Sequence, residues 1–496
     1  MWWFSILVLL YNSSFIFSQS LPLLLLVSFN GFRWDYPKLY GPLGNFSRLE
    51  QRGVHAHSMI PTFTTATYPN HYTLITGLYE EIHGLISDHM YDPKTNQTFQ
   101  AGETTANQWW PFKTIWTLNE QMNGARSGVI NWPQGFISTS KYEPYKKDRS
   151  FKDTIDLMLS WFNDQDRPIN FGAMYFPEPD LTGRRTGPYS SNMKATIKQC
   201  DEYLGYLLNE IDKDIRLKTK LHLIITSDHG MEQINATDRP MYLEDFVNIN
   251  KLKAFGTETV LNIFVNQPND INSILQNLTQ IPHSNTYKKE NLPVRYHYKT
   301  NSRIGDLIII VEPGYELHRQ SFRICEDGGT RVDLNTIHGN SGYDNQIDSM
   351  KTIFYASGPE LKENFTLSKS INLNNVDIFP LMCLILNIEK CSLSNGTLSH
   401  IQPFLNDPSK LSSLNGKETE KLHDGPMGLV IYLLVLVSFV LILIMAVAWS
   451  AVSFRNASAM ARAAHPDAAT IAEQNQYKFT QINDLKLHPS IGDDNL

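Results

Sequence analysis

The chain has 496 residues and a formal net charge of −7, and 42% of its residues are hydrophobic and 19% charged. Such a composition is typical of globular proteins and excludes an intrinsically disordered chain. No stripe of Lys and Arg follows the sequence, so we expect no nucleic-acid polymer among its partners.

Residues 1–20 are predicted to be a secretory signal peptide. An apolar run extends from Trp2 to Leu10, and the segment ends near the small residues Ser18 and Ser20. No Lys or Arg precedes the run, as one usually does in a signal peptide. The alternative is a short buried strand.

Residues 427–453 are predicted to form a transmembrane helix. This segment is apolar and uncharged, and it is long enough to cross about 30 Å of hydrocarbon. Arg455 and Arg462 follow it, which favours a cytoplasmic C-terminus. The expected topology is a type I single-pass protein of the plasma membrane. Its parts are an extracellular domain over 21–410, a juxtamembrane linker over 411–426 and a cytoplasmic tail over 454–496.

The cysteines and glycosylation motifs fit an extracellular domain. Cys383 and Cys391 are close in sequence and are the disulfide pair we favour. A pairing of Cys200 with Cys325 stays open. Asn-x-Ser/Thr triplets between the two apolar segments predict N-glycosylation at Asn45, Asn96, Asn235, Asn277, Asn364 and Asn395.

Continuous apolar runs predict strands that are buried on both faces, as in a parallel sheet. The runs cover residues 22–29, 221–226 and 306–311, and 169–175 is a weaker candidate. Between two of them, residues 190–217 have apolar side chains at helical spacing. This alternation predicts an α/β fold with a mostly parallel central sheet.

Polar residues follow three of these strands, where open α/β sheets bind ligands. They are Asn30, Asp180, and the pair Asp228 and His229. A carboxylate beside an imidazole suits a metal ion. Alone, however, Asp228 and His229 are equally explained by a helix cap and a surface His, and Asp180 by a turn.

A further motif begins at Thr67, continues through Pro69 to Tyr72 and precedes an amphipathic run. At a helix N-terminus its hydroxyl would lie at the positive end of the dipole, which stabilises an attacking alkoxide. Taken alone, Thr67 is better explained as a plain helix cap.

Together these motifs resemble the ectonucleotide pyrophosphatase/phosphodiesterase family of the alkaline phosphatase superfamily, in its membrane-anchored, single-domain form. The likeness extends from about Leu23 to Thr397 and includes the segments 30–36, 67–79, 179–183, 226–231 and 342–345. It implies an alkaline-phosphatase-like α/β sandwich with helices on both faces of the sheet. It also implies two zinc ions that stabilise the attacking and leaving oxygens.

The resemblance assigns roles to four residues that match the family's motifs. Thr67 matches the nucleophile that forms a covalent nucleotidyl intermediate. Asp228 and His229 match ligands of the zinc ion that activates this nucleophile. Asp180 matches a ligand of the other zinc ion.

Four other positions depart from the family's motifs. Asn30 replaces an Asp ligand, while Arg184 and Ser341 replace His ligands. Asp88 replaces an Asn that contacts phosphate, so an anion stands where the family has a donor. Arg cannot ligate a metal ion.

These replacements predict at most one weakly bound zinc ion, because a catalytic zinc ion normally has about three protein ligands. We hypothesise that Arg184 takes the position of the missing zinc ion and pairs with Asp180. His338 and His89 could substitute as ligands, although surface histidines are the more common explanation.

Three functions are compatible with this sequence. The first is a catalytically impaired member of the family that binds an extracellular nucleotide or an unknown surface ligand. The second is an active hydrolase of nucleotide phosphodiester or pyrophosphate bonds, which uses Thr67 and one or two zinc ions. The third is an adhesion or receptor protein whose cytoplasmic tail signals.

Overall fold

The computed structural model describes residues 21–102, 106–235, 240–319, 336–388, 391, 394–411 and 449. The chain divides into two units, Met1–Asn415 and Gly416–Leu496. Within the described ranges, no helix has the length and apolarity needed to cross a membrane. The predicted signal peptide lies outside these ranges, as do the predicted tail and, apart from Leu411 and Trp449, the predicted linker and span.

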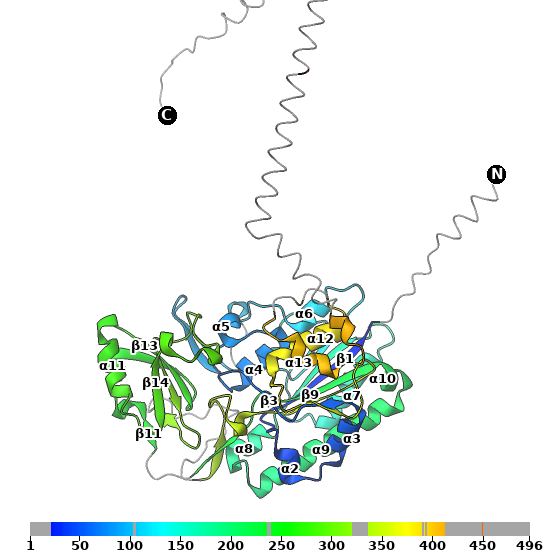
Figure 1. Ribbon diagram of the computed structural model, residues 1–496, viewed down its shortest axis with the longest axis horizontal. Helices are drawn as coiled ribbons and strands as arrows, with labels where there is room; N and C mark the ends of the chain where they lie inside the picture. The colour runs from blue at the N-terminus through cyan, green and yellow to red at the C-terminus, as the bar shows by residue number, and fades with distance from the viewer. Residues whose placement is uncertain are drawn as a thin grey trace, which may run out of the picture. The chain divides into compact units, whose positions relative to one another are not determined.

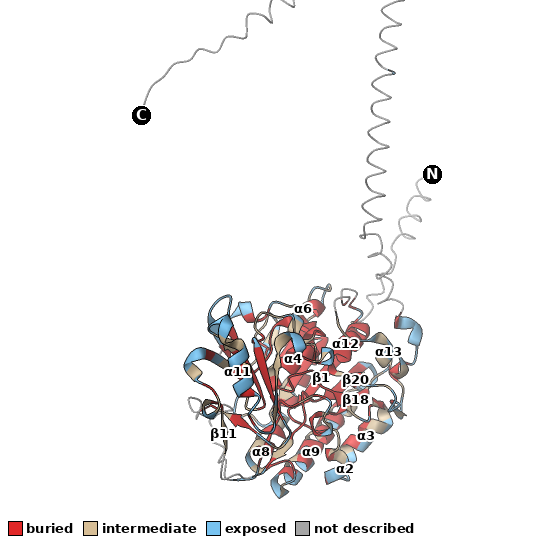
Figure 2. Cartoon of the chain, turned by 60° about the vertical axis from the view of Figure 1, so that its left-hand side comes forward, coloured by how far each residue is buried: buried red, intermediate tan, exposed pale blue. Residues whose placement is uncertain are grey.

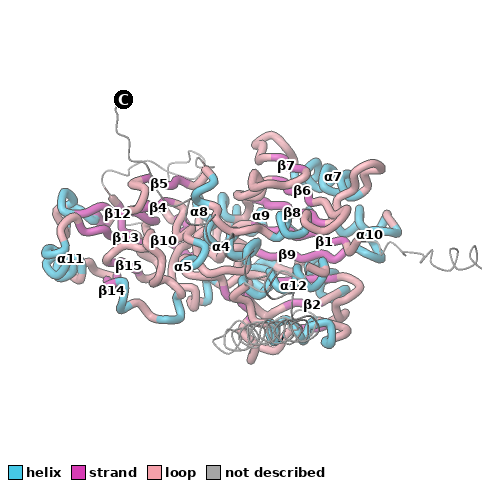
Figure 3. The backbone as a smooth tube through the Cα atoms, turned by 90° about the horizontal axis from the view of Figure 1, so that it is seen from above, coloured by secondary structure: helices cyan, strands magenta, loops and turns pink. Residues whose placement is uncertain are grey.

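The first unit is built on an eight-stranded sheet with β1 (Leu23–Phe29) near its centre. β1 pairs in parallel with β8 (Phe171–Phe176) on one side and β9 (Leu221–Thr226) on the other. The strand order is β19-β2-β18-β9-β1-β8-β6-β7 (Figure 3). The other strands are β2 (Val54–His55), β6 (Ser127–Ile130), β7 (Lys141–Glu143), β18 (Phe354–Ser357) and β19 (Phe365–Thr366). The sheet is mixed, because β18 is antiparallel to both of its neighbours.

Both faces of this sheet are buried, which explains the continuous apolar sequence of β1. Leu24 and Leu26 pack into one core, and Leu25 and Val27 into the other. The first core is completed by α4 (Thr67–Thr76), α6 (Ile115–Asn119) and α12 (Ile378–Leu386). The second is completed by α3 (Gly44–Arg52), α7 (Phe151–Phe162) and α9 (Ser191–Lys213). Figure 1 shows these helices around the sheet, and in Figure 2 the buried residues are concentrated at the same place.

A second sheet is antiparallel and has the strand order β12-β13-β15-β14. Its strands are β12 (Leu252–Gly256), β13 (Val260–Val265), β14 (Ser284–Lys288) and β15 (Leu307–Val311), and α11 (Ile271–Leu278) packs on it. The prediction that 306–311 belongs to a parallel sheet was therefore wrong. β15 has the same apolar pattern because Ile308 and Ile310 face the first core, while Leu307 and Ile309 face the core under α11.

The remaining elements are short. The helices are α2 (Tyr36–Tyr40), α5 (Glu80–His83), α8 (Asp180–Thr186), α10 (Ile215–Lys220) and α13 (Leu398–Ile401). The strands are β3 (Met59–Ile60), β4 (His89–Asp92), β5 (Gln97–Gln100), β10 (Glu232–Ile234), β11 (Met241–Tyr242), β16 (Leu317–His318), β17 (His338–Asn340) and β20 (Leu373–Asn374).

A disulfide joins Cys383 of α12 to Cys391, the pair that the sequence favoured. Cys200 is buried in α9 as a free thiol. Its proposed partner Cys325 lies outside the described residues.

Candidate active site

The carboxyl ends of β1, β8 and β9 bring three of the predicted site residues to one edge of the sheet. The backbone N–H of Asp180 donates to the carbonyl of Asn30 over 2.9 Å. The N–H of Gly31 donates to Oδ1 of Asp228 over 3.0 Å. Gly31 has a φ of +70°, and a Cβ there would lie 2.9 Å from Cβ of Asp180. The Asn-Gly turn therefore allows this close approach.

Thr67 is the first residue of α4, as the motif predicted. Its hydroxyl lies 3.0 Å from Nε2 of His229, and Nδ1 of His229 lies 2.8 Å from the carbonyl of Gly230. Because a carbonyl only accepts, Nδ1 of a neutral His229 carries the proton. Nε2 is then the acceptor for the Thr67 hydroxyl, an arrangement that suits proton transfer from a nucleophile.

Two oxygens beside Thr67 are buried without a hydrogen-bond partner among the described residues: Oδ1 of Asn30 and Oδ2 of Asp228. Oδ2 of Asp228 lies 3.4 Å from Nδ1 of His71. Burial lowers the pKa of His71, although Asp228 opposes the shift. The amide of Asn30 donates to the hydroxyl of Tyr175 over 2.8 Å. Unsatisfied buried oxygens of this kind are suited to a cation.

The guanidinium of Arg184 binds the residues around the other predicted zinc position. Nε donates to Oδ2 of Asp180 over 2.7 Å. Nη1 donates to Oδ1 of Asn340, and Nη2 donates to Oγ of Ser341, each over 3.0 Å. Asp180 is 2% exposed. The pair predicted between Arg184 and Asp180 is therefore present in the structure, with Ser341 also in contact with the cation.

Asp88 lies against the N-terminus of α4. Its Oδ1 accepts the backbone N–H of Tyr68, the residue after Thr67, over 2.8 Å. Free N–H groups in the first turn of a helix are what binds phosphate oxygens in many proteins. Here one of them is bonded to a carboxylate of the protein itself.

The residues present do not fit two zinc ions. A guanidinium fills the space around Asp180, and it repels a second cation. Beside Thr67, only Asp228 and His229 provide strong zinc ligands, and Asn30 adds a neutral oxygen. In the part of the chain that the structure describes, no three His, Cys, Asp or Glu side chains gather as a metal site. A zinc ion normally has at least three protein ligands, so the site beside Thr67 fits one ion only incompletely.

His338 and His89, the two candidate substitute ligands, do not reach the predicted zinc positions. Nε2 of His338 lies 3.0 Å from Oε2 of the buried Glu316. His89 packs against Phe255. Glu316 also accepts from the amide of Asn340, so a polar network leads from His338 to Arg184.

Three residues of this site were not predicted from the sequence: Asn340, Glu316 and Tyr175. Asn340 directly precedes Ser341, which was the one signal that could have identified it. Tyr175 ends the predicted strand 169–175, just before the segment 179–183, whereas Glu316 lies far from the motifs in sequence and is brought in by the fold.

The predicted glycosylation sites differ in exposure. Asn96, Asn235, Asn277 and Asn364 are exposed, whereas Asn45 and Asn395 are half-buried. The Asn45 amide donates to Asp201 over 3.0 Å, and Asn395 accepts the N–H of Tyr79.

Known proteins are similar to this chain over most of the region described above. Residues 24–344 match the family model described as type I phosphodiesterase / nucleotide pyrophosphatase. A bis(5'-adenosyl)-triphosphatase of Xenopus laevis is 35% identical over 395 residues, which cover 78% of this chain and 82% of the relative. Human ectonucleotide pyrophosphatase/phosphodiesterase family member 5 is 36% identical over 392 residues, which cover 77% and 78%.

Solved structures are similar over the same region. Human ectonucleotide pyrophosphatase/phosphodiesterase 5 has a TM-score of 0.70 at 34% identity, and the match covers 78% of this chain and 100% of that one. An inactive variant of the murine protein, in complex with AMP, has a TM-score of 0.70 at 32% identity with the same coverage.

Proposed function

The chain belongs to the type I phosphodiesterase / nucleotide pyrophosphatase family, and on this premise we propose that it is a cell-surface member with impaired catalysis that acts by binding. The resemblance to this family implies a reaction in which two metal ions stabilise the attacking and leaving oxygens. The replacements at Asn30, Asp88, Arg184 and Ser341 then remove parts on which that chemistry depends.

The observation that carries this proposal is the triple contact of Arg184 with Asp180, Asn340 and Ser341. A fixed cation stands among the side chains that would hold a zinc ion. It can neutralise Asp180 and keep the fold intact, but it offers no open coordination position to a reacting oxygen. Catalysis that needs two ions is thereby prevented, whereas the framework for binding remains.

The proposed ligand is an extracellular nucleotide. Support comes from the relatives, since one is named a bis(5'-adenosyl)-triphosphatase and a solved structure contains AMP. The charges here weaken such binding, because Asp88, Asp180 and Asp228 oppose the single guanidinium of Arg184. A phosphate group is repelled by this excess of carboxylates. We therefore expect weaker nucleotide binding than in the relatives, or binding of another surface ligand.

The proposed location is the extracellular face of the plasma membrane. It is supported by the apolar segments 1–20 and 427–453 and by the glycosylation motifs. Four of those motifs have an exposed Asn, as attachment of a glycan requires. We propose at most one zinc ion, bound weakly beside Thr67.

A second candidate is slow hydrolysis of a nucleotide phosphodiester. It is favoured by the 3.0 Å contact between the Thr67 hydroxyl and His229 at the start of α4. In such a reaction, His229 would accept the proton of Thr67 and the helix N-terminus would stabilise the developing charge. With a zinc ion bound, Nε2 of His229 would be a ligand instead of the proton acceptor, and the ion would supply the stabilisation of the attacking oxygen.

The decisive experiment measures metal content and turnover in the purified full-length chain. Zinc is quantified by mass spectrometry, and hydrolysis is followed with a nucleotide phosphodiester. We expect at most one zinc ion per chain and turnover far below that of an active relative assayed in parallel. Two zinc ions with rapid turnover would refute the proposal, and Thr67-dependent slow turnover would favour the second candidate.

A further inference from the structure

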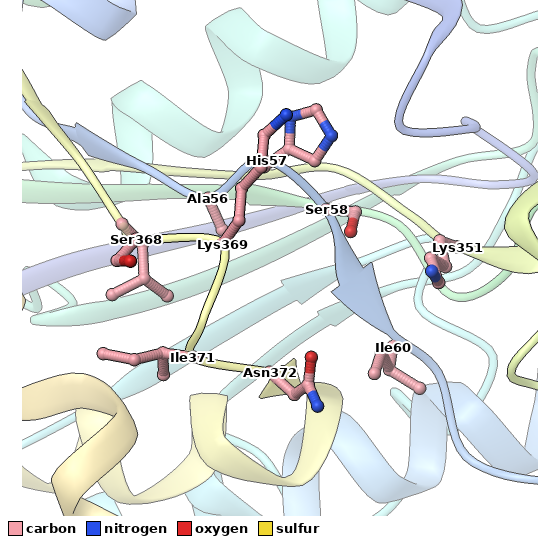
Figure 4. Close-up of a pocket in the computed structure, with 10 residues that line it drawn as sticks. Ala56, His57, Ser58, Ile60, Lys351, Ser368, Lys369, Ile371 and Asn372 are labelled. Atoms are coloured by element: carbon pink, nitrogen blue, oxygen red, sulfur yellow. The ribbon is translucent and has the colours of Figure 1, made fainter.

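A small hollow on the first unit shares no residue with the candidate active site. It lies where the segment between β2 and β3 meets the segment that leads into β20 (Figure 4). Its polar lining consists of His57, Ser58, Lys351, Ser368, Lys369 and Asn372. Neither the family's reaction nor the site around Thr67 uses any of these side chains.

The size of the hollow restricts its ligand. Its volume is about 140 Å³, which is the liquid volume of about five water molecules at about 30 Å³ each. Pockets for drug-sized ligands have roughly 300–1,000 Å³. The hollow is therefore large enough for one small charged group and too small for a whole nucleotide.

The polar lining is rich in hydrogen-bond donors. Two ammonium groups, an imidazole, two hydroxyls and an amide surround the space. Figure 4 shows Lys369 next to His57 and Lys351 on another side of the hollow. Donors that come from several sides match an acceptor with oxygens in several directions, such as a tetrahedral oxyanion, better than a planar carboxylate.

The local charge is positive although the chain as a whole is acidic. Lys351 lies 2.6 Å from Asp348, but that carboxylate is 77% exposed, and an exposed ion pair of this kind is weak. No carboxylate pairs with Lys369 within the described ranges. Burial lowers the pKa of His57, and Lys369 and Lys351 lower it further.

One rim of the hollow is held in place by Trp34. Its ring packs on His57 with centroids 4.6 Å apart, and its indole N–H donates to the carbonyl of Asp348 over 2.8 Å. These contacts hold the His57 side of the hollow close to the turn that bears Lys351.

We propose that this hollow binds a phosphate or sulfate group through Lys351, Lys369 and His57, independently of the site around Thr67. The group would be a free ion, a phosphate ester or a sulfate of a glycan, and these share the same tetrahedral oxyanion.

The test titrates the purified full-length chain with inorganic phosphate, inorganic sulfate, a sulfated disaccharide and acetate in an isothermal titration calorimeter. The variant K351Q/K369Q is compared with K146Q/K213Q. The control variant removes the same charge from two exposed lysines, which pair with Glu143 and Glu210 outside the hollow. Adenosine binding is measured in parallel to report on the site around Thr67, because adenosine has no phosphate group for the hollow to bind.

We expect phosphate or sulfate to bind more tightly than acetate, and K351Q/K369Q to weaken this binding by at least about tenfold, because two charge-assisted contacts are lost. The control variant should bind both oxyanions as the wild-type chain does, and adenosine binding should be the same in all three proteins. Tighter binding of the sulfated disaccharide than of inorganic sulfate would identify a glycan as the source. The proposal is overturned if neither oxyanion binds the wild-type chain, or if K351Q/K369Q binds them as the wild-type chain does.

Discussion

Nε of Arg184 lies 2.7 Å from Oδ2 of Asp180, a residue that the resemblance to the family matches to a metal ligand. The carboxylate is buried, whereas the side chain of the Arg is 18% exposed. Burial of a carboxylate costs free energy unless it is paired, so the ion pair with Arg184 stabilises the folded chain at this position.

Loss of Arg184 should therefore destabilise the fold. We expect Arg184→Met to lower the free energy of unfolding by about 3 kcal/mol, because the buried carboxylate of Asp180 loses its charge-assisted hydrogen bond to Arg184. Chemical denaturation of the full-length chain measures the change. Arg185→Met is the matched control, since Arg185 is exposed and lies 3.7 Å from Glu178. Addition of Asp180→Asn should recover much of the loss, and a deficit that persists in the double variant would argue against an electrostatic cause.

Restoration of the family's residues should restore metal binding. We expect the combined variant Asn30→Asp, Asp88→Asn, Arg184→His and Ser341→His to bind two zinc ions per chain, because each zinc position then has at least three protein ligands. Turnover of a nucleotide phosphodiester should rise with zinc content. A folded variant that still lacks zinc would show that further changes have disabled the site.

Asp88 should oppose the binding of nucleotide phosphates. Its carboxylate holds the N–H of Tyr68 at the start of α4. We expect Asp88→Asn to raise the affinity for AMP by at least about tenfold, because two charges about 4 Å apart near a protein surface interact by roughly 4 kcal/mol. Calorimetry measures the affinity, with Asp407→Asn as an exposed control. If the wild-type chain, Asp88→Asn and Asp407→Asn bind AMP with equal affinity, Asp88 does not oppose the binding of nucleotide phosphates.

Protonation of His338 should contribute to stability at low pH. Burial lowers its pKa, but the hydrogen bond and charge of Glu316 outweigh burial, and the result is a raised pKa. Because the pKa of His338 is raised in the folded state, its contribution to the free energy of unfolding is complete below about pH 6.5. The contribution is lost as the pH rises through the folded-state pKa. We expect His338→Gln to reduce the dependence of unfolding free energy on pH between about pH 6 and pH 8. If the unfolding free energy of His338→Gln depends on pH as that of the wild-type chain does, another titratable group causes the dependence.

Glu316 should have the opposite pH dependence. Burial raises its pKa, but hydrogen bonds from His318 and His338 lower it to about 2. The contribution of Glu316 to the free energy of unfolding is present above about pH 4.5 and is lost as the pH falls through about 2.

The disulfide between Cys383 and Cys391 closes a short loop at the end of α12. We expect the variant C383A/C391A to lose about 2–3 kcal/mol of unfolding free energy, as the entropy of a loop of this length implies. A reducing agent should lower the unfolding temperature of the wild-type chain and leave that of the variant unchanged. If the reducing agent lowers the unfolding temperatures of the wild-type chain and of C383A/C391A equally, it does not act through this disulfide.

The sequence predicted three of the eight strands of the central sheet, β1, β8 and β9. Two of them are continuously apolar, and polar residues follow all three. The site around Thr67 could be predicted for the same reason, since each motif follows a strand or begins a helix. The antiparallel sheet was not predicted, because β15 is buried on both faces like a parallel strand. Glu316 was missed, since its contact with His338 depends on packing between segments distant in sequence.

If Arg184 takes the place of a metal ion, as proposed above, the control of this site changes as well. A bound ion can dissociate, be removed by a chelator or be exchanged when its supply changes. A side chain is attached covalently and keeps its charge at any physiological pH. The occupancy of this position is therefore decided at translation, and the folded protein has become insensitive to the availability of zinc there.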